Sequence, residues 1–446
     1  MTQRAGLALV QGAPDTAEQP LRRMNVATFA GIMVAALVAA VFGIIGAVTH
    51  SGGQLRPGAS GTVILDSGTG TSYIWCGSNG HELCPAANYT SARLAAGAGG
   101  TNVSVQGVST GSLARYPRGQ EIGIPNLPPP PGDLIRGPWS VCVAPVGNAT
   151  GPQQQIVTLV AGQSVGGQPV GAGQAVAVRT QNQSWIIWND ERLAVTRKYL
   201  NAVLAGAAQA PVPAQWLDSL AQGPDFAPPV IANLGAPAAN GPNGAAVVGQ
   251  VYRAVGAAGT QWYVQLKDGV APISRTQAQL LIAETGSAQN ASLSAVTSHP
   301  SHRTLEDQGL PQTPPQAAAY DAATPLCATA GQGSSVGQVT LNGTIPGGGL
   351  AAQGATGVNT IWLPPGRGAL IGVTTAKGQQ TASRYFLVAG ASRYALASQA
   401  VAADLGYNLS TQATLVPVNI ANLIPRGAVL DPVRARLPVS QQVAGG

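Results

Sequence analysis

Charged side chains are scarce in this chain, and they form no long run of one sign. Asp, Glu, Lys and Arg make up 9% of the 446 residues, and the net charge of +6 comes from 23 basic and 17 acidic residues. A protein that follows a phosphate backbone needs a dense basic patch, and no run of Lys or Arg forms one. We therefore expect no nucleic-acid partner.

Catalytic patterns are equally sparse. No G-x-x-x-x-G-K-[ST] string occurs, so the sequence has no P-loop. The segment from Gly162 to Gly166 matches the G-x-S-x-G nucleophile elbow around Ser164, but glycines and a proline follow where that motif requires a helix. His299 and His302 flank Pro300 and have no Cys or acidic cluster spaced to complete a metal site. We predict a glycine-rich turn, exposed loop histidines, and no catalytic, metal or cofactor site.

One apolar run is long enough to cross a membrane. It extends over 23 residues from Val26 to Val48, and no Asp, Glu, Lys or Arg lies between Arg23 and Arg56. At about 1.5 Å per residue, such a helix spans a hydrocarbon core of about 30 Å. A cleaved secretory signal is the alternative, because Arg22 and Arg23 precede the run, but signal apolar regions have only about 7–15 residues. The basic flank predicts a cytoplasmic N-terminus and a remainder outside the cytoplasmic membrane.

The four cysteines, Cys76, Cys84, Cys142 and Cys327, all follow this run. An even number in an oxidising compartment favours two disulfides, and the spacing matches no zinc-binding pattern. Three pairings are possible from the sequence. A Cys76–Cys84 pairing closes a short local loop and leaves Cys142–Cys327 as a long-range bridge.

A pattern of about twenty residues recurs along the rest of the chain. An aromatic residue opens a strand, a tight turn and a second strand follow, and a helix ends at a Leu. The aromatic and the Leu are Trp185 and Leu204, Trp262 and Leu281, and Tyr385 and Leu405. A fourth copy begins at Ser72 and is interrupted by the loop from Cys76 to Cys84. Every copy except the third continues into a second half, and Ser287 to Pro315 is predicted as a connector. Such units cannot bury a face alone, so they are expected to pack against a shared core or a partner.

The 58 Gly and 34 Pro residues predict many turns and short strands, and 45% hydrophobic residues are enough to build cores. We predict an α+β protein. One N-terminal transmembrane helix precedes an elongated periplasmic region, in which four degenerate β-hairpin/helix repeats surround a central β domain that a Cys142–Cys327 disulfide would staple. The predicted segments are a cytoplasmic tail (1–25), the transmembrane helix (26–48), a spacer (49–61), repeat 1 (62–132), the central β domain (137–173 and 320–375), repeat 2 (174–235), repeat 3 (245–300) and repeat 4 (378–436).

Several strings carry a resemblance to a known family. They are Asn88 to Leu94, Glu121 to Pro125, Val248 to Tyr252 with Asp268 to Val270, and Pro325 to Cys327. Together with the anchor, the repeats and the cysteines, the chain resembles the EccB family of the type VII (ESX) secretion machinery over nearly its whole length.

The resemblance implies a scaffold subunit of a secretion complex in the cytoplasmic membrane. Its periplasmic part would assemble with copies of itself and support the export of WXG-type proteins. The implied partners are the EccC ATPase, EccD, EccE, the membrane and, further, a mycosin protease. The family's staple cysteines fall on Cys142 and Cys327, with Cys76–Cys84 as an extra clip. Some relatives are labelled ATPases, but no nucleotide motif supports an enzyme here. A membrane-anchored cell-wall-binding module is the alternative function, and an exported hydrolase or ATPase is a third.

Overall fold

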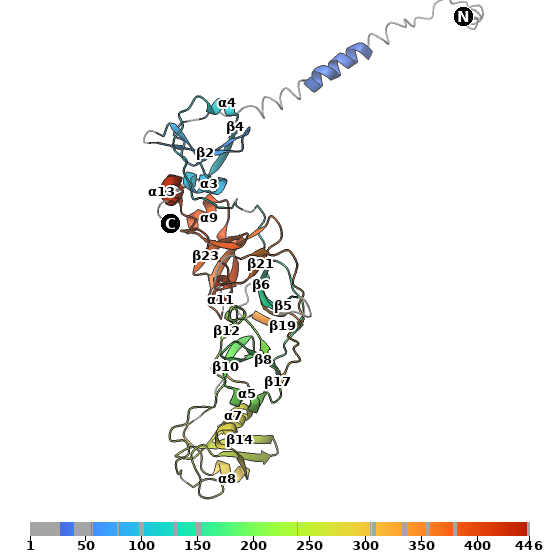
Figure 1. Cartoon of the computed structure of the whole chain (residues 1–446), viewed down its shortest axis with the longest axis vertical. Helices are drawn as coiled ribbons and strands as arrows, with labels where there is room; N and C mark the ends of the chain where they lie inside the picture. The colour runs from blue at the N-terminus through green and yellow to red at the C-terminus, as the bar shows by residue number, and fades with distance from the viewer. Residues whose placement is uncertain are drawn as a thin grey trace, which may run out of the picture. The chain divides into compact units, whose positions relative to one another are not determined.

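The structure is a computed structural model (Figure 1), and it describes residues 27–39, 55, 57–77, 80–97, 102–128, 130, 132–147, 154–238, 240–303, 305, 309–331, 337–352, 357–377 and 381–443. The chain divides into two compact units. Unit 1 comprises Met1–Pro85 with Ser104–Gly119, and unit 2 comprises Ala86–Val103 with Gln120–Gly446.

Part of the predicted transmembrane segment is helical. Residues 27–39 form a helix with exposed side chains. Residue 26 and residues 40–48 of the predicted span lie outside the described residues, as does the predicted tail 1–25. Within the described ranges, no helix combines the length and the apolar character that a membrane crossing needs.

Unit 1 contains a four-stranded sheet in the order β3-β2-β1-β4. Its elements are β1 (Thr62–Asp66), β2 (Ser72–Cys76), β3 (Glu82–Pro85), β4 (Ser104–Val108) and α4 (Thr110–Leu113). Ile64, Leu83 and Leu113 are fully buried and form its core. The rings of Trp75 and Tyr116 meet edge to face at 5.1 Å beside this core. One small apolar cluster therefore holds the sheet and α4 together.

The centre of unit 2 is a seven-stranded sheet in the order β20-β21-β6-β5-β18-β19-β7. Its strands are β5 (Trp139–Val146), β6 (Gln154–Ala161), β7 (Gln168–Pro169), β18 (Leu326–Ala330), β19 (Gly337–Leu341), β20 (Leu350–Ala351) and β21 (Thr360–Trp362). The first three strands and the last four come from two separate stretches of the chain. The long β5–β6 hairpin comes first in the chain. β18 pairs with β5 at one edge of the hairpin, and β21 pairs with β6 at the other edge.

Three further sheets complete the strands of unit 2. The second sheet has the order β11-β8-β9-β10-β12 with β17 added to β8, the third β15-β14-β13-β16, and the fourth β24-β23-β22-β25. The second contains β8 (Gln174–Arg179), β9 (Ser184–Trp188), β10 (Glu191–Val195), β11 (Ala210–Pro211), β12 (Ala221–Gln222), β17 (Gln316–Ala317), α5 (Arg197–Val203) and α6 (Ala214–Asp218). The third contains β13 (Val251–Gly256), β14 (Gly259–Gln265), β15 (Val270–Ile273), β16 (Ala288–Ala291), α7 (Arg275–Thr285) and α8 (Leu293–Thr297). The fourth contains β22 (Gly368–Thr374), β23 (Arg384–Ala389), β24 (Ser392–Ala395), β25 (Thr414–Pro417), α9 (Gln399–Asp404), α10 (Leu409–Gln412) and α11 (Val418–Asn422). The remaining helices are α3 (Tyr89–Gly97), α12 (Pro432–Ala435) and α13 (Val439–Val443).

The sheet of unit 1 and the second, third and fourth sheets share one strand plan. Three antiparallel strands are followed in the chain by a helix, and the next strand pairs parallel to the first: β4 with β1, β11 with β8, β16 with β13 and β25 with β22. The chain then returns to the third strand with the same backbone hydrogen bond. The N–H of Gly119 donates to Leu83, Gly223 to Arg192, Ser301 to Val270, and Gly427 to Arg393, at 2.8 to 3.1 Å.

Two sequence predictions require correction. The third sheet has the second half that was expected to be absent, because β16 and α8 occupy the predicted connector. β16 is an edge strand, paired with a neighbour on one side only, and its Gln289 and Asn290 are exposed. Polar residues are common on such strands, so the segment lacked the apolar pattern of a buried strand. The boundary at residue 375 is also wrong, because β22 pairs with β23 and β25 and not with the central sheet. β22 is a largely apolar run whose seven residues are all buried. From the sequence, such a run is typical of a strand in the central core.

One buried core connects the central sheet with the second and fourth sheets. It includes Trp139 of β5, Val176 of β8, Trp216 of α6, Ile371 of β22 and Ile420 of α11, all at most 2% exposed. Because these side chains share one cluster, neither neighbouring sheet can separate from the central sheet without exposing large apolar groups to water. The α+β class predicted from the sequence is confirmed.

Helix pairs join the remaining parts of unit 2. α5 and α7 lie side by side (Figure 1), and Leu280 of α7 is buried in the core of the second sheet. Lys198 of α5 forms an ion pair of 2.8 Å with Glu284 of α7, and the Tyr199 hydroxyl donates to the same carboxylate. Likewise α3 packs against α9 and α12, and Arg93 Nε donates to the Asp404 carbonyl at 2.8 Å.

Candidate functional site

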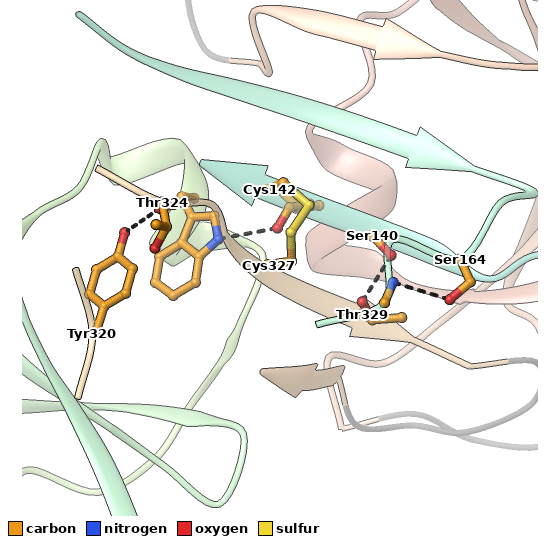
Figure 2. The surroundings of a disulfide bond; sticks show 10 residues. Ser140, Cys142, Ser164, Tyr320, Thr324, Cys327 and Thr329 are labelled. Carbon is orange, nitrogen blue, oxygen red and sulfur yellow. Dashed lines mark hydrogen bonds between the residues drawn. A yellow bond between two sulfur atoms is a disulfide. The ribbon is translucent and has the colours of Figure 1, made fainter. Parts of the chain in front are cut away.

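The most constrained feature of unit 2 is the disulfide at the centre of its largest sheet. Cys142 of β5 lies directly opposite Cys327 of β18 in the antiparallel register, and their Cα atoms are 4.0 Å apart (Figure 2). Both residues are fully buried. The bond joins positions 185 residues apart in the chain. It therefore fixes together the two stretches that build the central sheet, and it is the pairing that the family resemblance implies.

Polar contacts on both sides of the disulfide fix the same strand pair. Ser140 and Thr329 pair across the same strands two positions from the disulfide, and their hydroxyls lie 2.8 Å apart (Figure 2). The fully buried indole of Trp216 donates from Nε1 to the Val141 carbonyl at 3.1 Å. An indole N–H buried at this depth needs such a partner, and the bond locates α6 against β5.

The second disulfide lies in unit 1. Cys76 ends β2 and Cys84 lies on β3, so the bond closes the hairpin across a separation of eight residues. Gly119 packs against it, because a Cβ built there would lie 2.5 Å from Cys84 Sγ and 2.9 Å from Cys76 Sγ. The returning chain can therefore approach the disulfide only at a glycine.

The structure separates the sequence motifs that resemble catalytic sites. Ser164 lies in a loop after β6, its hydroxyl accepts a hydrogen bond from the Gly166 N–H, and no helix follows within the described loop. His299 and His302 are exposed beside β15, where the His299 carbonyl accepts from the Val270 N–H. Among the described residues, no group of three or more His, Cys, Asp or Glu could hold a metal ion.

A cavity in the fourth sheet was missed by the sequence reasoning. It has a volume of about 830 Å³ and is lined by three arginines, Arg384, Arg393 and Arg426. Arg393 is 5% exposed, lies over the Phe386 ring at 5.0 Å and donates from Nη2 to Asn422 Oδ1 at 3.1 Å. Burial, together with the charge of Arg426, lowers the pKa of the Arg393 guanidinium. An alignment of the repeats would have indicated Arg393, because Arg192 occupies the corresponding position on the third strand of the second sheet.

Comparison with known proteins places this arrangement in a family. A family model described as "Type VII secretion system ESX-1, transport TM domain B" matches residues 1–441. A protein named ESX-3 secretion system ATPase EccB3 from Mycolicibacterium smegmatis is 28% identical over 454 residues, which cover 92% of this chain and 83% of that protein. The EccB3 protein of Mycobacterium tuberculosis is 29% identical over 285 residues, which cover 59% of this chain and only 50% of that protein.

The same fold occurs in solved structures. One, described as the EccB3 dimer from the ESX-3 core complex, has a TM-score of 0.66 and 24% identity and covers 84% of this chain and 99% of its own. Another, described as an intact ESX-5 inner membrane complex, has a TM-score of 0.65 and 23% identity and covers 98% and 93%. At this level of identity, the likeness establishes the fold.

Proposed function

The chain belongs to the EccB family of type VII secretion proteins, and from that premise we propose that it is a structural scaffold subunit of a type VII (ESX) secretion complex. The observation that carries the proposal is the family match over residues 1–441, nearly the whole of the 446-residue chain. The structure supports a mechanical role, because buried contacts such as the hydrogen bond from Trp216 Nε1 to the Val141 carbonyl join a helix to a strand of the central sheet. Ser164 of the G-x-S-x-G string lies in the loop after β6, and His299 and His302 lie in a different loop beside β15.

A scaffold of this kind needs rigid connections between its parts. Here the Cys142–Cys327 disulfide, the core shared by three sheets and the α5–α7 junction supply them within unit 2. A load applied to the fourth sheet would reach the second through buried apolar contacts, which do not deform gradually. The protein would thus hold partner subunits at fixed spacing, which is the proposed mechanism.

We assign the chain to the cytoplasmic membrane as a single-pass protein with the run Val26–Val48 as its anchor. The N-terminus would lie in the cytoplasm, with the disulfide-bearing remainder outside, where an oxidising compartment maintains both bonds. Protease added to spheroplasts should then digest the region after residue 51. Protection of that region in intact spheroplasts, with digestion only after lysis, would contradict the assignment.

The proposed partners are further copies of this chain, the EccC ATPase, EccD, EccE and a mycosin protease, in support of the export of WXG-type proteins. The names of two solved structures support this, since they describe an EccB3 dimer and an ESX-5 inner membrane complex. Cross-linking mass spectrometry on intact membranes would identify which of these subunits the chain contacts.

We further propose that the four sheets of common strand plan are degenerate repeats around the central domain. Repeat 1 spans 62–132, repeat 2 spans 174–235, repeat 3 spans 245–300, and repeat 4 runs to 436 from the start of β22. The shared hydrogen bond from the returning chain to the third strand supports this. Four unrelated sheets would have no reason to share it.

The proposed role involves no catalysis, although the relatives' names contain the word ATPase. The absence of a P-loop string from the sequence supports this. ATP turnover by the purified chain, abolished by one point substitution that leaves the fold intact, would overturn it.

Native electrophoresis tests the scaffold role directly. Membranes extracted in a mild detergent should show the chain in an assembly far heavier than its own 44.8 kDa, and a denaturing gel of the same extract provides the monomer control. A monomer in every mild detergent would refute the proposal.

A further inference from the structure

The arginine-lined cavity of the fourth sheet contains a buried charge without an acidic partner. Arg393 is 5% exposed, and its Nε, like that of Arg192, makes no hydrogen bond with any residue that the structure describes. Its only hydrogen-bonded side chain in those residues is the neutral amide of Asn422. Arg384 and Arg426 line the same cavity, and no Asp or Glu does. A buried charge normally has a counter-charge, because removing it from water is unfavourable unless another charge or hydrogen bonds compensate.

The second sheet contains the same arginine with that counter-charge present. Arg192 and Arg393 both accept the returning backbone hydrogen bond, from Gly223 and Gly427. Each guanidinium also lies over an aromatic ring of the neighbouring strand, Arg192 over Trp185 at 5.5 Å. These shared contacts make the two arginines corresponding residues of one strand plan.

The two sheets differ in the last residue of the helix that follows the parallel strand, α6 after β11 and α11 after β25. α6 ends at Asp218, whose Oδ1 lies 2.6 Å from Arg192 Nη1, whereas α11 ends at Asn422. The residue paired with the arginine on the returning chain also differs, since Gln222 pairs with Arg192 in the second sheet. In the fourth sheet Arg426 pairs with Arg393. At these two positions the surroundings of Arg393 have one negative charge fewer and one positive charge more than those of Arg192.

We propose that this cavity is a carboxylate-binding site for an acidic residue of a protein segment. A ligand carboxylate would lie in the cavity beside the Asn422 amide and would supply to Arg393 and Arg426 the negative charge that Asp218 supplies to Arg192, and charge-assisted hydrogen bonds of this kind are strong. The cavity volume of about 830 Å³ is larger than one carboxylate group needs. Val373, Val418 and Val429 form an apolar part of its lining. An acidic residue with apolar neighbours therefore suits it.

The test measures binding to the purified full chain in detergent by saturation-transfer NMR. The probes are capped Leu-Glu-Leu and Leu-Gln-Leu tripeptides, free glutarate and inorganic phosphate. The Glu tripeptide should bind at least about tenfold more tightly than the Gln tripeptide, as expected for a charge-assisted contact. It should also bind more tightly than glutarate or phosphate.

The key variant is Asn422→Asp, which places the carboxylate of the second sheet into the fourth. It should weaken the Glu tripeptide at least about tenfold without removing an arginine. Arg426→Gln replaces an exposed arginine with glutamine, the residue type found at the corresponding Gln222 of the second sheet. It should weaken binding several-fold, because one positive charge is lost. It serves as the independent variant if Asn422→Asp does not fold. Asn408→Asp is the matched control, because it adds the same charge at the cap of α10, outside the cavity lining, and should leave binding unchanged.

Equal binding of the two tripeptides, or no binding of either up to about 10 mM, would overturn the site. Unchanged affinity in folded Asn422→Asp and Arg426→Gln would overturn its location. Glutarate as tight as the Glu tripeptide would overturn the protein-segment assignment in favour of a free carboxylate, and phosphate displacing both would overturn the carboxylate assignment.

Discussion

Removal of the Cys142–Cys327 disulfide should destabilise the protein more than removal of Cys76–Cys84. The perturbation is a pair of double variants, Cys142→Ala with Cys327→Ala and Cys76→Ala with Cys84→Ala. Alanine is preferable to serine, because a hydroxyl at fully buried Cys142 would lack a partner and add its own cost. A disulfide stabilises mainly by restricting the unfolded chain, and the restriction grows with loop length. For separations of 185 and 8 residues, the expected losses are about 5 and about 2.5 kcal/mol.

The assay is denaturant unfolding of the purified full chain, with free energies extrapolated to water. Free energies must be compared and not melting temperatures, because a small unit unfolds with a small entropy and its Tm moves further for the same change. Near-UV circular dichroism of each double variant verifies that native packing survives. Equal losses in the two variants would refute the reasoning, because loop length would then have no effect on stability.

Three further changes have definite expected outcomes. Gly119→Ala should destabilise unit 1 by about 1–3 kcal/mol, because its Cβ would overlap the disulfide sulfurs, while Gly107→Ala, with nothing within 4 Å, should be close to neutral in the same unfolding assay. Hydrogen bonds from the lysine and tyrosine of α5 lower the pKa of Glu284, so its stabilising contribution is present above the usual pKa of 4.5 and is lost as pH falls through the lowered value. Glu284→Gln should therefore remove part of the acid-side slope of the stability curve, and an unchanged slope would contradict this ion pair. Trp216→Phe should cost about 1–3 kcal/mol, because it leaves the Val141 carbonyl without its donor, and amide hydrogen exchange should show α6 opening more often.

Local signals predicted the hairpins and helix starts well. Asn189 and Asp190 both adopt positive φ, 51° and 59°, in the turn between β9 and β10, as their residue types favour. Ser274 is the N-cap of α7, a position that serine favours, and its side chain accepts from the Gln277 N–H in a capping box. These features depend on residues adjacent in the chain, which a single sequence records.

Features set by distant partners could not be predicted in the same way. β11 and β12 have two residues each, and their strand character comes entirely from pairing with β8 and β10. Such short segments carry no period of their own. The importance of Asn422 was likewise invisible, because an amide at a helix end is unremarkable until the corresponding carboxylate of Asp218 is found beside its arginine.

The strands of the central sheet are synthesised at widely separated times. Its β5–β6 hairpin emerges from the ribosome before the second and third sheets, yet its neighbour β18 starts only at Leu326. During synthesis both edges of the hairpin therefore remain unpaired until well over a hundred further residues have been made. Over the same period Cys142 is a free thiol, because Cys327 has not yet been made. Cys76 and Cys84 are already present and can form incorrect disulfides with it. In the proposed topology, with the cysteines outside the cytoplasmic membrane, we expect a thiol oxidant or isomerase in that compartment to affect the yield of folded protein more than the stability of the final fold does.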